Sequence, residues 1–216
     1  MNKSIATVKE VEYLTPSAYL LRLEKNNISF QAGQYISLGL PGDAEKREYS
    51  VYSGENEAVL EVLIKEVEEG LVSKQLKSLM PGSRVEIDGP FGFFTISPHL
   101  RNNRKLLFIA SGTGIAPFHS YIRTYENLDY KLLHGIRYLD EAYGREDYNP
   151  DRYIVCTSKD RGGTFHGRVT DYIRANPVNK DTLCYLCGNS EMIHDVYDIL
   201  TGQGVPSENL HAEVYF

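Results

Sequence analysis

The chain has 216 residues, of which 42% are hydrophobic, and a formal net charge of −6. Its length allows one large domain or two modest ones with sizeable apolar cores. The acidic charge argues against nucleic acid as the main partner, and no apolar run approaches the roughly 20 residues that span a bilayer. The N-terminus lacks the apolar segment of a signal peptide, and its few cysteines predict no disulfide framework. We therefore expect a cytoplasmic protein that contacts no membrane.

Residues 1–99 have the pattern of short β-strands. Apolar and polar residues alternate, as in YLLRL at 19–23, and Thr15-Pro16-Ser17 marks a turn. A single short helix is expected at 71–78. Six or more short strands with one helix predict a small antiparallel β-barrel, which we assign to residues 1–99. The expected strands lie at 6–14, 19–24, 34–40, 48–53, 59–66 and 84–88.

Residues 100–216 alternate strands with helices. Helices are expected to begin at Phe118, Arg168 and Ser190, and a last strand ends the chain. This alternation predicts an α/β domain with a parallel, Rossmann-like sheet covered on both faces. The polar stretch 97–104 is the expected linker between the two domains. The other expected strands lie at 105–111, 131–138, 153–158 and 182–187.

The stretch 105–123, KLLFIASGTGIAPFHSYIR, has the order strand, glycine turn, helix. Gly112 and Gly114 allow the backbone to reverse and to approach a ligand closely, with Thr113 between them. Pro117 suits a first helical turn, where no N–H is needed. The start of a helix after a glycine turn favours a phosphate. The alternative is an ordinary strand-to-helix turn, and G-x-G-x-x-P departs from the dinucleotide fingerprint at its third position.

Five motifs resemble those of the ferredoxin–NADP(+) reductase family in its short bacterial form. They occur in the family's order and span Arg47 to Phe216, about four-fifths of the chain. The family has an R-x-Y-S strand, a G-x-x-S helix start, the turn TGIAPF, a C-G-x-x-x-M segment and a final E-x-Y. The matching segments here are 47–50, 70–73, 113–118, 187–192 and 213–215. The resemblance implies a two-domain flavoprotein that binds FAD and NADP(H).

By this resemblance the barrel holds FAD. Arg47 pairs with the pyrophosphate, Tyr49 lies against the isoalloxazine ring, and the Ser50 hydroxyl lies near flavin N5. Without the resemblance, this strand would be read as a surface ladder. The residue after Ser50, Val51, is also an expected FAD contact. The G-x-x-S segment contacts the pyrophosphate and supplies the other expected FAD contacts, which are Gly70, Leu71, Val72 and Ser73.

The resemblance also assigns the nicotinamide side. Cys187 lies beside nicotinamide C4 as a positioning residue, with Gly188 and Met192 in the same motif. The spacing of Cys184 and Cys187 is also that of a thioredoxin-type pair, but such a pair belongs at a helix start, and these cysteines precede the turn on a strand. Ser50, Cys187 and Glu213 are the residues expected around hydride transfer.

The C-terminus is expected to cover the flavin. Tyr215 matches the aromatic residue that shields the ring in the family, and Phe216 matches an extra aromatic of the bacterial forms, which lies toward the FAD adenine. The alternative is an edge strand whose aromatics pack on the sheet. Because Tyr215 must move for nicotinamide to enter, a conformational gate is expected.

Three cations at family positions predict NADPH as the donor. Arg137 follows the second strand in His-x-x-Arg-Tyr, Lys159 follows Ser158, which is itself an expected contact, and Arg168 lies in HGRV. Alone, each is read as a solvated surface charge. Asp160 argues for NADH, because NADH-specific relatives place an acid on the ribose hydroxyls.

The resemblance implies a monomer that passes electrons singly to a small carrier, ferredoxin or flavodoxin. The chain has no C-x-x-x-x-C-x-x-C cluster for an iron–sulfur centre. An acidic carrier would need a basic face near the flavin. The alternatives are the reductase component of an oxygenase or other multicomponent system, and a non-catalytic nucleotide-binding subunit. The residues that would supply part of a basic face are Lys46, Arg47, Lys65, Lys74 and Lys77.

Overall fold

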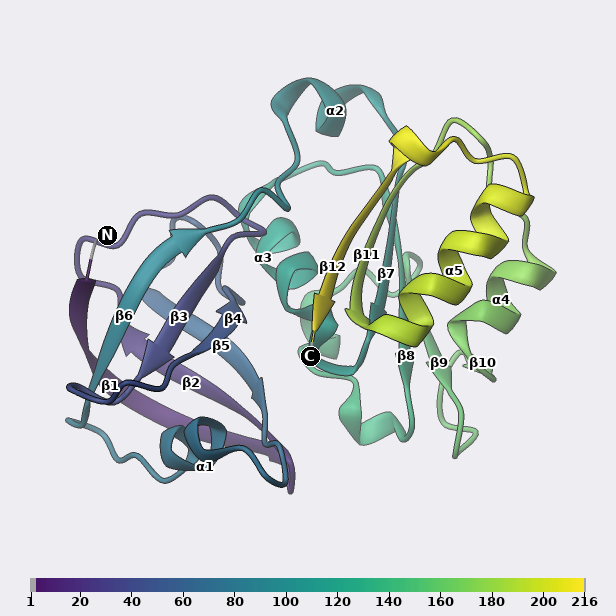
Figure 1. Cartoon of the computed structure of the whole chain (residues 1–216). Coiled ribbons are helices and arrows are strands. Elements are labelled where there is room, and N and C mark those ends of the chain that lie inside the picture. Colours follow the sequence, from purple (N-terminus) through teal and green to yellow (C-terminus); the bar gives the residue numbers. More distant parts are fainter. Residues whose placement is uncertain (1–2, 216) are drawn as a thin grey trace. The chain divides into compact units, whose positions relative to one another are not determined.

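The computed structural model describes residues 3–215 and contains two six-stranded sheets (Figure 1). The first sheet is antiparallel and the second is parallel throughout. The predicted fold class, an antiparallel barrel followed by a Rossmann-like domain, is confirmed. Within residues 3–215, no helix is long and apolar enough to cross a membrane.

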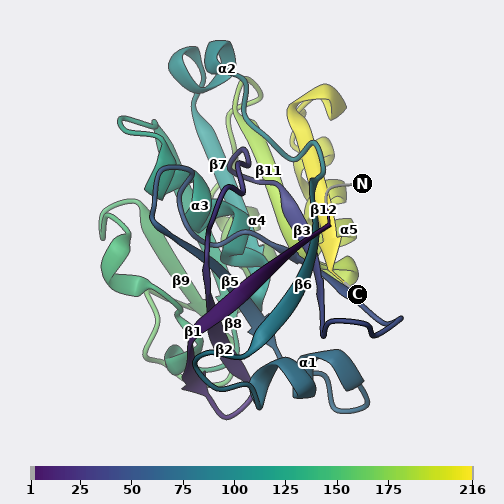
Figure 2. The same cartoon turned by 90° about the vertical axis from the view of Figure 1, so that its left-hand side faces the viewer.

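The antiparallel sheet has the order β4-β3-β6-β1-β2-β5, and a bridge between Val51 and Val62 joins its two ends. The strands form because alternate residues turn to one apolar core, in which Tyr19, Leu21 and Leu23 of one strand are buried. Helix α1 (Leu71–Lys77) lies at one end of this sheet (Figure 2) and contributes Val72 and Leu76 to the core. The strands are β1 (Lys3–Thr15), β2 (Ala18–Glu24), β3 (Tyr35–Gly39), β4 (Arg47–Ser50), β5 (Val59–Lys65) and β6 (Arg84–Phe91).

The parallel sheet has the order β10-β9-β8-β7-β11-β12. The chain first moves outward from β7 through β8 to β9 and then returns to place β11 on the other side of β7, so the order reverses between β7 and β11. Helices α4 (Val169–Ala175) and α5 (Ser190–Gly202) lie together on one face of the sheet (Figure 1). The strands are β7 (Leu106–Ser111), β8 (Tyr130–Ile136), β9 (Tyr153–Thr157), β10 (Phe165–His166), β11 (Leu183–Asn189) and β12 (Leu210–Tyr215).

Three local features differ from the expectations. The stretch predicted as a linker contains helix α2 (Pro98–Asn103), because Ser97 Oγ accepts a hydrogen bond from the Leu100 amide and proline occupies the first turn. Helix α3 (Ala116–Thr124) begins before the predicted residue, and β10 was not predicted. Short 3-10 helices lie at η1 (Gly112–Ile115), η2 (Leu139–Glu141), η3 (Arg145–Asp147) and η4 (Ser207–Asn209).

The chain forms two compact units, and α3 belongs to the unit of the barrel. The first unit comprises residues 1–95 and 116–125, and the second comprises 96–115 and 126–216. Within the first unit, Ser120 Oγ donates to the Ser53 carbonyl at 2.7 Å, and Arg123 forms an ion pair with Glu57 at 2.6 Å. The domain boundaries predicted from the sequence, 1–99 and 100–216, stay a prediction.

Candidate functional site

Two glycine turns meet where the order of the parallel sheet reverses. Strands β7 and β11 are neighbours, and turns follow at Gly112 and at Gly188. A Cβ atom on Gly114 would lie 2.4 Å from the Cys187 carbonyl oxygen, and one on Gly188 would lie 2.3 Å from Ser111 Oγ. Only glycine therefore lets the two turns pack this closely. The carboxyl ends of strands at such a reversal are where open α/β sheets bind nucleotides.

The first of these turns presents open backbone. Gly112 has a φ of +53°, and no atom lies within 4 Å of the place where its Cβ would be. The turn continues as η1 and α3, and the first amides of a helical turn have no acceptor inside the helix. Amide donors beside a space without side chains suit an anion such as a pyrophosphate. This segment, with Thr113 half-buried in it, fits the predicted nucleotide site.

A fully buried histidine lies directly beneath this turn. His134 Nε2 lies 2.8 Å from the Gly112 carbonyl oxygen, and Nδ1 lies 2.7 Å from the Tyr153 hydroxyl. Burial lowers the pKa of His134 to about 4, although the Gly112 bond opposes this shift. The imidazole is therefore neutral at physiological pH. In the sequence, His134 is recognisable only as part of the His-x-x-Arg-Tyr motif, and no pattern pairs it with Tyr153.

Backbone hydrogen bonds bring the predicted phosphate-binding loops together at the carboxyl ends of the parallel strands. The Lys159 amide donates to the Arg137 carbonyl at 3.0 Å, and the Ser158 amide donates to the Ile136 carbonyl at 3.1 Å. The Gly167 amide donates to Thr157 at 2.9 Å, which brings the segment before Arg168 to the end of β9. All three cationic side chains are exposed.

Asp160 is engaged by the backbone of these loops. Its Oδ2 accepts from the Leu139 amide at 2.7 Å, and its Oδ1 accepts from the Gly162 amide at 3.0 Å. The Leu139 bond, and then the Gly162 bond, lower the pKa of Asp160. Both carboxylate oxygens are thus already acceptors within the protein. The structure gives Asp160 a structural role that the sequence did not indicate.

Cys187, Glu213 and Tyr215 gather at the end of β11. Cys187 is opposite Glu213 in the parallel pair β11–β12, and Asn189 is opposite Tyr215. Burial raises the pKa of the Cys187 thiol well above its usual value, the Glu213 carboxylate raises it further, and a hydrogen bond with Tyr215 opposes the shift. The thiol is therefore protonated at neutral pH. Phe216, which was predicted to lie beside Tyr215, falls outside the described residues.

The first turn of α5 is capped by a side chain. Asn189 Oδ1 accepts hydrogen bonds from the Glu191 amide at 3.0 Å and the Met192 amide at 3.3 Å. Met192 itself is half-buried against the apolar core of the parallel sheet. Asn189 was not among the predicted site residues, although an asparagine before a helix is a recognisable N-cap.

Strand β4 carries the predicted flavin residues of the barrel. Arg47 is opposite Leu38 and Tyr49 is opposite Ile36, so Arg47 and Tyr49 share one face of the strand. The Arg47 side chain is exposed, and Tyr49 packs partly against the barrel core. Burial raises the pKa of Tyr49 to about 12, and Arg47 opposes this shift. A cation and an aromatic ring thus lie side by side on one strand.

Two further predicted flavin residues are buried beside them along the chain. Ser50 follows Tyr49 at the end of β4, and Val51 forms the bridge that joins the ends of the sheet. Arg47 and Glu48 are the exposed charges of the R-x-Y-S motif, and Arg47 lies 3.8 Å from the Glu45 carboxylate. A guanidinium next to a phenol suits the phosphate and ring of a flavin nucleotide.

The start of α1 is ordered by Ser73. Its hydroxyl accepts from the Val67 amide at 3.1 Å, and its carbonyl accepts from the Tyr19 hydroxyl at 2.6 Å. Gly70 precedes the helix, and no side chain caps it. Leu71 is exposed and Val72 is buried in the core. The segment 70–73 is therefore anchored on the barrel while its first turn stays uncapped, which fits the expected pyrophosphate contact.

Two of the lysines expected on a basic face carry no free charge. Lys46 is ion-paired with Glu86 at 2.5 Å and with Asp88, and Lys77 is ion-paired with Glu66 at 2.5 Å. Their charge is largely neutralised within the barrel. Of the five expected residues, Arg47, Lys65 and Lys74 have exposed side chains.

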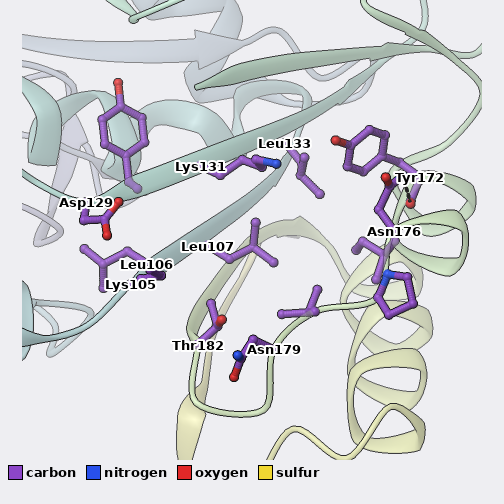
Figure 3. A pocket seen from close by; sticks show the side chains of 14 residues that line it. Lys105, Leu106, Leu107, Asp129, Lys131, Leu133, Tyr172, Asn176, Asn179 and Thr182 are labelled. Atoms are coloured by element: carbon purple, nitrogen blue, oxygen red, sulfur yellow. Dashed lines mark hydrogen bonds between the residues drawn. The ribbon is translucent and has the colours of Figure 1, made fainter. Parts of the chain in front are cut away.

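A pocket of about 340 Å³ lies at the opposite end of the strands of the parallel sheet (Figure 3). Leu107 and Lys131 from the strands, with Lys105 just before β7, line one side, and Tyr172 and Asn176 from α4 and its end line the other (Figure 3). It contains none of the predicted site residues and lies at the amino ends of β7 and β8. Because nucleotides bind at the carboxyl ends of parallel strands, the candidate site is the end of the sheet with the glycine turns.

The fold and these sites define a class of protein, the oxidoreductases that bind a flavin in a barrel and a nicotinamide nucleotide on a parallel sheet. Residues 6–96 match the oxidoreductase FAD-binding domain, and residues 108–198 match the oxidoreductase NAD-binding domain. Together these matches show an oxidoreductase with an FAD-binding domain followed by an NAD-binding domain, and its homologues include ferredoxin–NADP reductases.

The relatives include two kinds of reductase. The chain is 27% identical over 212 residues to the flavodoxin/ferredoxin–NADP reductase of Escherichia coli, covering 87% of this chain and 86% of the relative. It is 29% identical over 228 residues to the toluate 1,2-dioxygenase electron transfer component of Pseudomonas putida, covering 97% of this chain and 67% of the relative. For the oxygenase and hydroxylase components among the first matches, the covered share is 64% to 67%.

A solved structure has the same fold over the whole chain. The ferredoxin NADP+ reductase of Neisseria gonorrhoeae, with bound FAD and NADP, superposes with a TM-score of 0.88 at 21% identity, and all of each chain is covered. At this identity the likeness establishes the fold.

Proposed function

We propose that this protein takes hydride from NADPH and passes electrons one at a time to a small carrier protein such as ferredoxin or flavodoxin. The observation that carries the proposal is the edge of the parallel sheet where Gly112 and Gly188 meet and where Arg137 and Lys159 are joined through the backbone. In a chain whose other half is an FAD-binding domain, this edge supplies the site of the hydride donor.

The barrel residues bind and orient the flavin. Bound FAD supplies the hydride acceptor and the capacity to release single electrons. Arg47 offers an accessible fork of donors to the pyrophosphate, and Tyr49 offers a flat ring for the isoalloxazine. Ser50 and Val51 lie next to them on the chain, and segment 70–73 contributes amides. Ser50 is the expected partner of flavin N5.

Cys187 and Glu213 would position the nicotinamide. The buried, protonated Cys187 thiol suits a packing and orienting role more than a nucleophilic one, because a nucleophile requires a thiolate. Glu213 lies across from Cys187 in the sheet. Tyr215 is held next to both, and we assign it the role of shielding the flavin until nicotinamide replaces it.

The preference for NADPH rests on the surroundings of Arg137, Lys159 and Arg168. Three exposed cations follow neighbouring strands, and a phosphate is recognised best by such charge-assisted bonds. Asp160 is the acid that follows Lys159 in the sequence, and backbone amides donate hydrogen bonds to both of its oxygens. These bonds give Asp160 a role within the loops that does not depend on a ribose hydroxyl.

The acceptor has a specific alternative. Relatives among the oxygenase and hydroxylase components, which the chain matches over 64% to 67% of their length, favour a reductase of a multicomponent system as the second candidate. The pairing of Lys46 and Lys77 with acids weakens the basic face expected for ferredoxin or flavodoxin. We keep the small carrier as the first candidate, with a monomer in the cytoplasm as the expected form.

The deciding experiment is anaerobic reduction of the purified protein, loaded with FAD, by NADPH. Bleaching of the flavin absorbance supports the proposal, and a protein that neither contains nor can be reconstituted with FAD contradicts it. Steady-state reduction of ferredoxin, flavodoxin and free flavin, measured side by side, then ranks the acceptors. Reduction of free flavin alone would favour the multicomponent alternative, whose own acceptor would be absent from the assay.

A further inference from the structure

We propose that His134 is a positioning residue that holds the Gly112 turn in the conformation that binds the pyrophosphate of NADP(H). The proposal rests on the proposed function of this turn. The observation that carries it is the placement of a fully buried imidazole between the Gly112 carbonyl and the Tyr153 hydroxyl.

The two hydrogen bonds fix the tautomer of His134. The Gly112 carbonyl can only accept, so Nε2 carries the proton and donates to it at 2.8 Å. Nδ1 is then the acceptor, and the Tyr153 hydroxyl donates a hydrogen bond to it at 2.7 Å. The Tyr153 ring is itself packed against Tyr148, with ring centroids 4.6 Å apart. The imidazole therefore has one orientation, set from strand β9.

The bond to Gly112 orients the next amide. In a trans peptide, the carbonyl and the following N–H point in opposite directions. Because His134 holds the Gly112 carbonyl toward the sheet, the Thr113 N–H is turned away from it. Gly112 has a φ of +53°, and glycine populates several backbone conformations at similar free energy. The backbone of Gly112 therefore does not fix the turn by itself. The side chain of His134 supplies the restraint that the glycine lacks.

Removing the imidazole should therefore weaken the binding of the pyrophosphate and spare the adenosine phosphate. We expect His134→Leu to raise the Kd for NADP+ about tenfold, as for one lost hydrogen bond to an oriented turn. The Kd for 2′-AMP, which lacks the pyrophosphate and depends on Arg137 and Lys159, should stay within about twofold. Both are measured by calorimetry on the FAD-loaded protein.

Three variants separate positioning from loss of stability. His134→Gln keeps a donor and an acceptor on one side chain and should recover most of the NADP+ affinity. Tyr153→Phe keeps the hydrogen bond from His134 to Gly112 but removes the hydroxyl that helps to fix the tautomer of His134. It should raise the Kd for NADP+ less than His134→Leu does. Leu132→Ala removes buried volume from the same face of β8, so it should lower the melting temperature without changing the Kd for NADP+.

The proposal is overturned if His134→Leu binds NADP+ as the wild type does. It is also overturned if the variant loses 2′-AMP and NADP+ in equal proportion, since that result indicates general loosening of the domain. A wild type that binds neither 2′-AMP nor NADP+ contradicts the proposed function itself. The two failures are thus distinguished by the wild-type titration.

Discussion

The Asp160 carboxylate accepts a hydrogen bond from the Leu139 amide at 2.7 Å and so ties the loop after β9 to the loop after β8. Its other oxygen accepts from Gly162 at 3.0 Å within its own loop. The two loops carry Arg137 and Lys159, the cations proposed for the 2′-phosphate. An acid beside the proposed phosphate site is thus compatible with NADPH, because its carboxylate has partners of its own in the backbone of these loops.

Asp160→Ala should therefore reduce the use of NADPH more than the use of NADH. Without the carboxylate, the loops that carry Arg137 and Lys159 lose one of the hydrogen bonds that join them, and we expect kcat/KM for NADPH to fall roughly three- to tenfold. If Asp160 instead bound the ribose hydroxyls, NADH would suffer the larger loss. Asp140→Ala, a change at an exposed neighbouring acid, is the matched control.

Arg137→Ala should cost on the order of tenfold to a hundredfold in kcat/KM for NADPH, the equivalent of one lost charge-assisted hydrogen bond of roughly 1.5–3 kcal/mol. NADH has no 2′-phosphate and should be nearly unaffected. The measurement is steady-state kinetics with both donors. Lys105→Ala, at the opposite edge of the sheet, serves as the control. Equal losses with both donors would contradict the assignment of Arg137.

Gly112→Ala should separate binding from stability. No atom lies within 4 Å of its new Cβ, so the expected cost is the roughly 1–2 kcal/mol of a left-handed backbone. The methyl group would, however, occupy the space proposed for the pyrophosphate, and the affinity for NADP+ should fall on the order of tenfold.

Gly114→Ala should affect the stability of the protein more than its affinity for NADP+. Its Cβ would lie 2.4 Å from the Cys187 carbonyl oxygen, and the backbone must shift to admit it. We expect a loss of about 1–3 kcal/mol in the free energy of unfolding, measured by denaturant titration. If Gly112→Ala proves the less stable of the two, the packing of the turns has been misread.

Deleting residues 215 and 216 should leave FAD bound, because the proposed flavin ligands Arg47 and Ser73 lie in the barrel. Nicotinamide should then occupy the ring face longer, and reduction by NADH should become faster relative to NADPH. Stopped-flow reduction with each donor measures the change. An unaltered flavin spectrum and an unaltered donor preference would assign Tyr215 a purely structural role at the edge of the sheet.

The stability of the protein should depend on pH through His134. Burial lowers the pKa of His134 to about 4, while an unfolded histidine titrates near 6.5, so the unfolded chain binds the proton first. The stabilisation is complete above pH 6.5 and is lost as the pH falls toward 4, which amounts to roughly 2–3 kcal/mol between pH 7.5 and pH 4.5.

His134→Leu lacks this titration, so the difference in unfolding free energy between the wild type and the variant should narrow at pH 4.5. Denaturant titrations at the two pH values measure it. Leu132→Ala, which removes no titratable group, should show no such narrowing. A constant difference between wild type and His134→Leu would mean that His134 titrates normally in the folded protein.

The sequence predicted the two sheets because their patterns differ in period. Alternation marks the barrel strands, while the continuous apolar run 106–110 marks a strand buried on both faces. Helix α2 was missed because its six residues hold no apolar period, although Ser97 and Pro98 were readable start signals. The short β10 carries too few residues for any pattern.

The site was predictable where a motif determines it and unpredictable where distant side chains meet. Glycines at 112, 114 and 188 follow from backbone requirements that the sequence displays. The partners of His134 and Asp160 do not, because Tyr153 and Leu139 are separated from them by 19 and 21 positions and are joined only by the register of the parallel sheet. The ion pairs of Lys46 were unpredictable for the same reason, since Lys46 precedes β4 while Glu86 and Asp88 lie on β6, with β3 between the two strands.

Helix α3 has a consequence for how such chains can be recombined. It follows the nucleotide turn in the sequence, yet it belongs to the compact unit of the barrel, where Tyr121 donates a hydrogen bond to the Phe94 carbonyl and a Cβ on Gly33 would collide with the Tyr121 ring. A cut near residue 99 would deprive the barrel of this helix and expose the surface that it covers. The two halves therefore cannot be exchanged between reductases as separate cassettes, and a viable chimera must carry 116–125 with the barrel that it packs on.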